Sequence, residues 1–153
     1  GGNLWRERTV GLTDGSAWEI TYTYDAMDRL VETTDSNDST VLYTWDHRDR
    51  LLLEEHILPD GDVTWTGAWT WDDRDRPVVK EGRSSGTPIR RTTWLYETLV
   101  EGHRTTRHEV DLRSGQEERD TLTYDALGRE VGGAYVDIYG STSTYETTWD
   151  CPG

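Results

Sequence analysis

The sequence has few of the residues that build an ordinary hydrophobic core. Of its 153 residues only 33% are hydrophobic, 30% are charged, and phenylalanine is absent. Apolar area must therefore come largely from eight tryptophans and eight tyrosines, each of which can bury roughly 150–250 Å² while keeping a polar atom near water. Disordered chains are depleted in such aromatics, so the composition favours a folded protein built on aromatic side chains.

Positive charge is also scarce, because Lys80 is the only lysine and the net charge is −14. Nucleic-acid binding depends on clustered lysine and arginine, so we expect no nucleic acid as a partner. No apolar run approaches the roughly 18 residues that a transmembrane helix needs, and we expect no membrane insertion. The acidic, threonine-rich composition favours a secreted or cell-surface protein.

Cysteine is limited to one residue, Cys151, three positions from the end of the printed chain. An internal disulfide is therefore excluded, and a cluster of cysteine metal ligands is excluded as well. The cysteine content leaves the redox compartment open.

One short pattern recurs along the whole sequence: aromatic, threonine, aromatic, aspartate, two variable residues, glycine or aspartate, and arginine. Its instances are 22–29, 43–50, 69–76 and 122–129. Residues 94–97 keep the aromatics but lose the turn residues, and a sixth instance begins at Thr148. The acidic positions 25, 46, 72, 97, 125 and 150 lie 21 to 28 residues apart, a period that is typical of stacked repeat architectures.

The repeat therefore predicts one tandem array over residues 1–153, with a unit of about 25 residues. The predicted units are approximately 2–27, 28–48, 49–74, 75–99, 100–127 and 128–153. Both ends of the chain are expected to fall inside a repeat.

Within each unit, apolar and polar residues alternate with a period of two, which indicates strands rather than helices. Trp18, Ile20, Tyr22 and Tyr24 would share one face of a strand. Return strands are predicted at 29–34, 50–57, 76–80 and 129–135, and opposite turns at Asp14-Gly15, 36–38, 59–62, 85–86 and 114–115. We predict an all-β fold: an antiparallel meander of tandem β-hairpins that forms an elongated, twisted or curved open sheet.

The motif residues are expected to be architectural. Each motif aspartate can accept amide hydrogen bonds from residues just ahead of it, and Gly128 suits a positive φ. The motif arginines are expected to stack on aromatic rings or to pair with the aspartates. The residues assigned this structural role are Tyr24, Asp25, Arg29, Trp45, Asp46, Arg50, Trp71, Asp72, Arg76, Tyr124, Asp125, Gly128 and Arg129.

The segments Tyr24-Asp25 to Arg29-Leu30 and Tyr124-Asp125 to Gly128-Arg129 resemble the YD repeats of Rhs proteins, teneurins and the shell subunits of toxin complexes. The resemblance implies that repeated hairpins form a long sheet, which in that family coils into a shell or barrel and often encloses a toxic C-terminal domain. The chain departs from the pattern where aspartate replaces the motif glycine, at Asp28, Asp49 and Asp75.

Catalytic and metal sites have little support in the sequence. The carboxylates recur by repeat, whereas an active site is normally a unique constellation. His103 and His108 are five residues apart on a predicted strand and would face opposite sides, while His47 and His56 are expected in a turn and at the surface. We expect no enzyme, no catalytic residue and no cofactor or metal. Calcium at the acidic turns stays an alternative.

Two functions remain open on sequence grounds. The first is a structural segment, a shell, scaffold or spacer of a larger secreted or surface protein, whose partners are further YD repeats and, through exposed edge strands, a second copy. The second is a surface that binds carbohydrate or a cell-surface protein. Its candidate residues are Trp65, Trp69 and Trp71, because aromatic faces beside carboxylates suit sugars.

Overall fold

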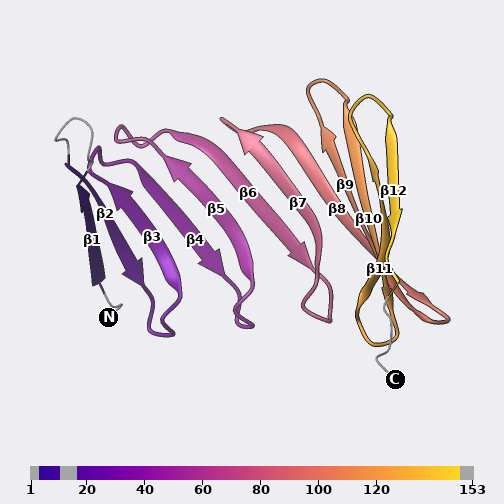
Figure 1. Cartoon of the computed structure of the whole chain (residues 1–153). Coiled ribbons are helices and arrows are strands. Elements are labelled where there is room, and N and C mark those ends of the chain that lie inside the picture. Colours follow the sequence, from indigo (N-terminus) through magenta and orange to yellow (C-terminus); the bar gives the residue numbers. More distant parts are fainter. Residues whose placement is uncertain (1–3, 11–16, 149–153) are drawn as a thin grey trace. The chain divides into compact units, whose positions relative to one another are not determined.

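The computed structural model describes residues 4–10 and 17–148, and every regular element within them is a β-strand (Figure 1). No helix of the described part is long and apolar enough to cross a membrane. The strands are β1 (Leu4–Val10), β2 (Ala17–Tyr24), β3 (Leu30–Asp35), β4 (Thr40–Trp45), β5 (Leu51–Ile57), β6 (Val63–Trp71), β7 (Pro77–Ser84), β8 (Thr87–Leu99), β9 (Gly102–Asp111), β10 (Glu117–Asp125), β11 (Glu130–Val136) and β12 (Thr142–Glu146).

The hydrogen-bonded order of the strands follows the order of the chain, from β1 to β12. Neighbours pair antiparallel from β1 to β6 and from β8 to β12. The predicted all-β class and the meander of tandem hairpins are therefore confirmed. The expected turn at Asp14-Gly15, the residues Trp149 and Asp150 of the last motif, and Cys151 lie outside the described residues.

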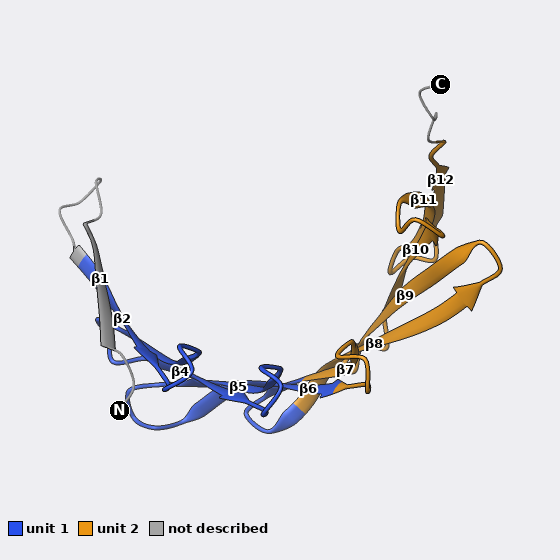
Figure 2. Cartoon of the chain, turned by 90° about the horizontal axis from the view of Figure 1, so that it is seen from below, with its two compact units in different colours: residues 1–70, 82–87 blue, residues 71–81, 88–153 orange. Residues whose placement is uncertain are grey.

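The chain divides into two compact units, which Figure 2 distinguishes by colour. Unit 1 comprises residues 1–70 and 82–87, and unit 2 comprises residues 71–81 and 88–153. Strands β6, β7 and β8 contribute residues to both. The subdivision into six sequence repeats stays a prediction.

The described part of the chain has no fully buried hydrophobic side chain. Thr92, with 4% of its surface exposed, is the side chain there that is buried most clearly. Most aromatic rings lie half-buried against neighbouring strands. Such a sheet draws its stability from cross-strand pairs and from its turns, because the burial of each ring is incomplete.

The fourth repeat closes its hairpin differently from the others. Strand β8 continues past the motif aromatic Tyr96 to Leu99, which pairs with Gly102 across a two-residue loop. Gly102 has a φ of +151°, and a Cβ there would lie 1.9 Å from the carbonyl oxygen of Tyr124. Glycine is required at this position because the backbone of β10 passes so close to it.

Candidate functional site

The turns that follow the motif aromatics share one hydrogen-bond pattern. The amide of Asp25 donates to the carbonyl oxygen of Arg29 at 2.9 Å. The amides of Met27 and Arg29 donate to Oδ1 of Asp25 at 2.8 and 3.0 Å. The same three bonds recur in the turns led by Asp46, Asp72 and Asp125. One carboxylate oxygen thus closes each turn.

The fourth residue of each turn adopts the left-handed conformation. Its φ is 59° at Asp28, 60° at Asp49, 60° at Asp75 and 77° at Gly128. Aspartate tolerates this region better than most residues, and glycine pays no steric penalty there. Both residue types therefore serve the same backbone geometry.

A register shift places the motif aromatic next to the turn. Tyr24 pairs with Leu30 and Trp45 pairs with Leu51, each after a bulge in the ladder. Tyr124 pairs with Glu130 in the same way. The bulge increases the local twist and sets the direction of the following arginine.

The second carboxylate oxygen of each motif aspartate is taken by the arginine four residues on. Nε and Nη2 of Arg29 lie 2.8 and 2.7 Å from Oδ2 of Asp25. The corresponding arginines Arg50, Arg76 and Arg129 make the same pair of contacts at 2.6 to 2.8 Å. Charge-assisted pairs of this two-point kind are the strong and geometrically specific class of hydrogen bond.

These contacts keep the motif carboxylates ionised. The hydrogen bond from the Arg29 side chain lowers the pKa of Asp25. Desolvation raises the pKa of Asp46, but the amides of Arg50 and Arg48 and the Arg50 guanidinium outweigh it and lower the pKa to about 2. A carboxylate held in this state does not exchange protons near neutral pH, so it is unsuited to general acid–base catalysis.

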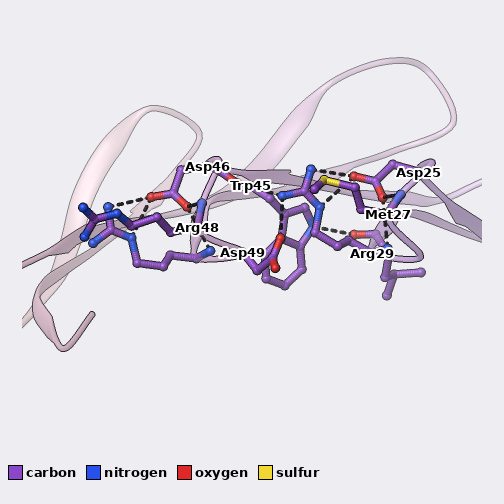
Figure 3. A network of polar contacts seen from close by, with 9 residues as sticks. Asp25, Met27, Arg29, Trp45, Asp46, Arg48 and Asp49 are labelled. Atoms are coloured by element: carbon purple, nitrogen blue, oxygen red, sulfur yellow. Dashed lines mark hydrogen bonds and ion pairs between the residues drawn. The ribbon is translucent and has the colours of Figure 1, made fainter. Parts of the chain in front are cut away.

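Arg29 also connects its own turn to the next one (Figure 3). Its Nη1 donates to the backbone oxygen of Asp46 at 2.7 Å and contacts Oδ1 of Asp49 at 3.1 Å. In return, Nε1 of Trp45 donates to the carbonyl oxygen of Leu30 at 2.7 Å. The two hairpins are therefore joined in both directions.

Unit 2 contains a related link between repeats. The guanidinium carbon of Arg76 lies 4.0 Å from the centre of the Tyr96 ring. The hydroxyl of Tyr96 donates to the carbonyl oxygen of Pro77 at 2.9 Å. Tyr96 stands where Trp45 stands in its repeat, and Pro77 follows the motif arginine as Leu30 does. A cation–π contact here replaces the hydrogen bonds of Arg29.

Two further turns use the same geometry at the opposite ends of the strands. Asp35 accepts the amides of Asn37 and Ser39 on Oδ1 at 2.8 and 2.9 Å. Asp137 accepts the amides of Tyr139 and Ser141, both at 2.9 Å. A turn near Asp35 was expected from the sequence, without a role for its aspartate, whereas the turn of Asp137 was not predicted. An aspartate followed three residues later by aspartate or glycine was the signal.

The aromatic candidates lie on one strand but in different surroundings. The rings of Trp65 and Trp69 cover Gly67, whose missing Cβ would lie 2.5 Å from Trp65 and 3.0 Å from Trp69. The ring of His56 meets Trp65 edge-on at 4.9 Å. Trp71 belongs to unit 2. All three tryptophans are half-buried, so part of each ring remains accessible.

The histidines are dispersed. His103 stacks on Tyr124 with ring centres 4.6 Å apart, and His108 contacts Glu117 at 3.1 Å. His56 contacts Glu54 at 2.8 Å, and His47 is exposed in the turn that Asp46 begins. No group of three potential metal ligands occurs among residues 18–148. Calcium binding stays an open alternative.

Comparison with known proteins supports the repeat assignment. The sequence model of the RHS repeat family matches residues 7–40. No curated protein matches the chain. A solved structure of a protein of unknown function from Bacteroides fragilis is similar over 96% of this chain and 94% of that one, with 12% identity and a TM-score of 0.30.

Proposed function

We propose that this chain, a member of the Rhs/YD-repeat family, acts as a shell, scaffold or spacer within a larger secreted or cell-surface protein. The RHS repeat match at residues 7–40 supports a structural repeat segment of an Rhs-like protein. The shell or spacer role and the location outside the cell are the proposed part.

The observation that carries the proposal is the recurrence of the Asp–Arg turn. Four turns have the same bonds, and each uses both oxygens of its aspartate. A carboxylate with both oxygens already bonded has no free position for a substrate. Repeated units that are linked to their neighbours are typical of structural repeat arrays. A catalytic centre, in contrast, is normally one unique arrangement of residues.

The incomplete burial of the aromatic rings supports further partners for the sheet. A chain that buries no hydrophobic side chain completely within its described residues leaves apolar area for additional contacts. Further repeats of the same polypeptide are the first candidates, since neighbouring repeats supply the buried surface in such arrays.

Protease resistance of the parent protein tests the scaffold role. We expect the double variant Asp46→Asn with Asp125→Asn to be cleaved several-fold faster in limited proteolysis than the wild-type protein. Asp38→Asn is the matched control, because Asp38 is exposed and its φ of 62° suits asparagine. Unchanged resistance in the double variant would reject the structural role of these turns.

The proposed location is tested separately on intact cells. An antibody against the repeat segment should label the cell surface or the culture medium, and added protease should remove the surface signal. Labelling only after the cells are opened would contradict a secreted or surface protein.

A second function, binding of carbohydrate or protein by the aromatic strands, is favoured by one observation. In unit 1, Trp18 is 46% exposed and Trp65 and Trp69 keep accessible ring area beside His56 and Glu54. Aromatic rings with carboxylates nearby suit the apolar faces and hydroxyl groups of sugars. Trp71, which belongs to unit 2, stays a separate candidate.

Quenching of tryptophan fluorescence by neutral oligosaccharides tests this alternative. Binding should be lost in Trp65→Ala and retained in Trp94→Ala, which removes a half-buried tryptophan from unit 2. No response to any sugar in the panel would remove carbohydrate from the alternative.

A further inference from the structure

A polar groove of about 580 Å³ lies in unit 2 over strands β8, β9 and β10. Its floor follows the strand register, in which Leu95, Thr106 and Thr121 are consecutive partners. Thr93, His108 and Arg119 form the next row. Alternation along the strands puts these side chains on one face. The Asp–Arg turns take no part in this groove.

The guanidinium groups of Arg104 and Arg119 in this groove have hydrogen-bond donors without a partner among the described residues. Arg119 is exposed, and its side chain makes no ion pair or hydrogen bond within residues 4–10 and 17–148. Nε of Arg104 is buried and lacks a partner. Nη1 of Arg104 lies 3.9 Å from Oε2 of Glu97, at the outer limit of an ion pair. The Arg104 side chain is still 42% exposed, so its terminal nitrogens can donate hydrogen bonds to a ligand in the groove.

The distance between the positive groups of the groove indicates the length of a ligand that would contact both. Arg104 and His108 are four residues apart on β9, or about 13 Å at the usual rise of a strand. Arg119 pairs with His108, so positive groups stand at both ends of the groove. Between them the hydroxyls of Thr106 and Thr121 lie 3.4 Å apart, and Leu95 is 58% exposed alongside.

We propose that this groove binds an acidic oligosaccharide, with one carboxylate at Arg104, another at Arg119, and ring hydroxyls at Thr106 and Thr121. Arginine recognises carboxylates through paired hydrogen bonds. Threonine hydroxyls both donate to and accept from sugar hydroxyls. The exposed Leu95 side chain offers an apolar contact for a ring face.

The chemistry of the groove favours this ligand over other anions. An acidic peptide would bind most readily by adding a strand, but the backbone groups of β9 are already paired with β8 and β10. Glu97 and Glu117 stand beside Arg104 and His108. Their carboxylates can accept hydrogen bonds from sugar hydroxyls, which a run of phosphates does not offer.

Titration calorimetry of the purified chain with trigalacturonic acid at low salt tests the proposal. We expect saturable binding that weakens about tenfold or more in Arg119→Gln and in Arg104→Gln. Arg90→Gln is the matched control, since Arg90 is 60% exposed on the opposite face of β8 and pairs with Glu109. Its affinity should equal that of the wild type. Arg119→Gln removes no side-chain hydrogen bond or ion pair among the described residues, so it keeps the test valid if Arg104→Gln fails to fold.

Ligand controls decide the chemical class. The methyl ester of trigalacturonic acid has the same rings without the charges and should bind at least tenfold more weakly. Absence of binding by the acid would overturn the proposal. Equal binding by the ester, by a tri-aspartate peptide or by the Arg119→Gln variant would overturn it as well. None of these outcomes bears on the scaffold role, which rests on the Asp–Arg turns.

Discussion

Six of the described turns are two versions of one turn. In four of them an aspartate is followed four residues later by arginine, as in Asp46 to Arg50, and in the other two by serine, as in Asp35 to Ser39. The amide of the aspartate reaches the carbonyl oxygen four residues on at 2.9 Å in the first and 3.0 Å in the second. The backbone therefore does not distinguish them.

The difference lies in the second carboxylate oxygen. In the Asp–Arg turns it accepts two bonds from the guanidinium, and Arg29 continues to the next hairpin. Serine is too short to supply either contact. The turn thus needs only its aspartate and a left-handed fourth residue, while the arginine adds the connection between repeats. Substituting the aspartate, the arginine and the left-handed residue one at a time tests these separate roles.

Removal of the aspartate should have the largest effect. Asp46→Ala takes the acceptor from the amides of Arg48 and Arg50 and leaves the Arg50 guanidinium without its partner. We expect the thermal unfolding midpoint to fall by roughly 8 °C. Circular dichroism during heating measures it. A fall no larger than that of Asp38→Asn would show that the side-chain bonds contribute little.

Low pH should remove part of the stabilisation that the Asp46 carboxylate provides. The pKa of Asp46 is lowered in the folded protein from 3.8 to about 2. Its stabilisation is therefore complete above about pH 4 and is lost as the pH falls through 2. We expect Asp46→Asn to unfold roughly 5 °C below the wild type at pH 6. The two should unfold together at pH 2, and a constant difference across this range would contradict the assignment.

Conversion of one turn version into the other should have a smaller effect. Arg50→Ser removes the ion pair but keeps the turn of Asp46, so we expect the unfolding midpoint to fall by roughly 3 °C. Added salt should shrink this difference, because exposed ion pairs are screened. The reverse change, Ser39→Arg, should raise the midpoint. A loss as large as that of Asp46→Ala would mean that the arginine also holds the turn.

Substitution at Gly128, the residue with left-handed backbone conformation, should have the smallest effect on stability. Gly128→Asp copies the residue found at Asp28, Asp49 and Asp75, so we expect a change below about 2 °C. Gly128→Ala places an ordinary side chain at a φ of 77° and should cost about 1 kcal/mol. Chemical denaturation of both variants measures the difference. An alanine variant as stable as the aspartate variant would show that φ is not limiting there.

Much of the fold was accessible from local patterns. Alternation of apolar and polar residues predicted the strands, and the return strand expected at 50–57 corresponds to β5 (Leu51–Ile57). The turn of Asp137 was not predicted because Val136 precedes it where Trp45 precedes Asp46, and Ser141 stands where Arg50 stands. The hairpin at Val100-Glu101 was not predicted either, since two-residue loops carry a weak signal when glycine follows the loop rather than occupying it.

The candidate sites depended more on long-range information. The contact of Arg29 with Asp46 and Asp49 joins residues 17 and 20 positions apart, and no local rule specifies it. The groove of Arg104 and Arg119 arises because β9 and β10 pair in one register. A shift by one residue would move Arg119 to the other face.

The amino-acid sequence thus specified the repeat, the strands and the residues able to close each turn, because these depend on interactions within a few positions. Strand register specified which turns are linked and which arginines lie in the same groove. Those features depend on side chains brought together from different hairpins, and cross-strand pairing places them without any local sequence signal.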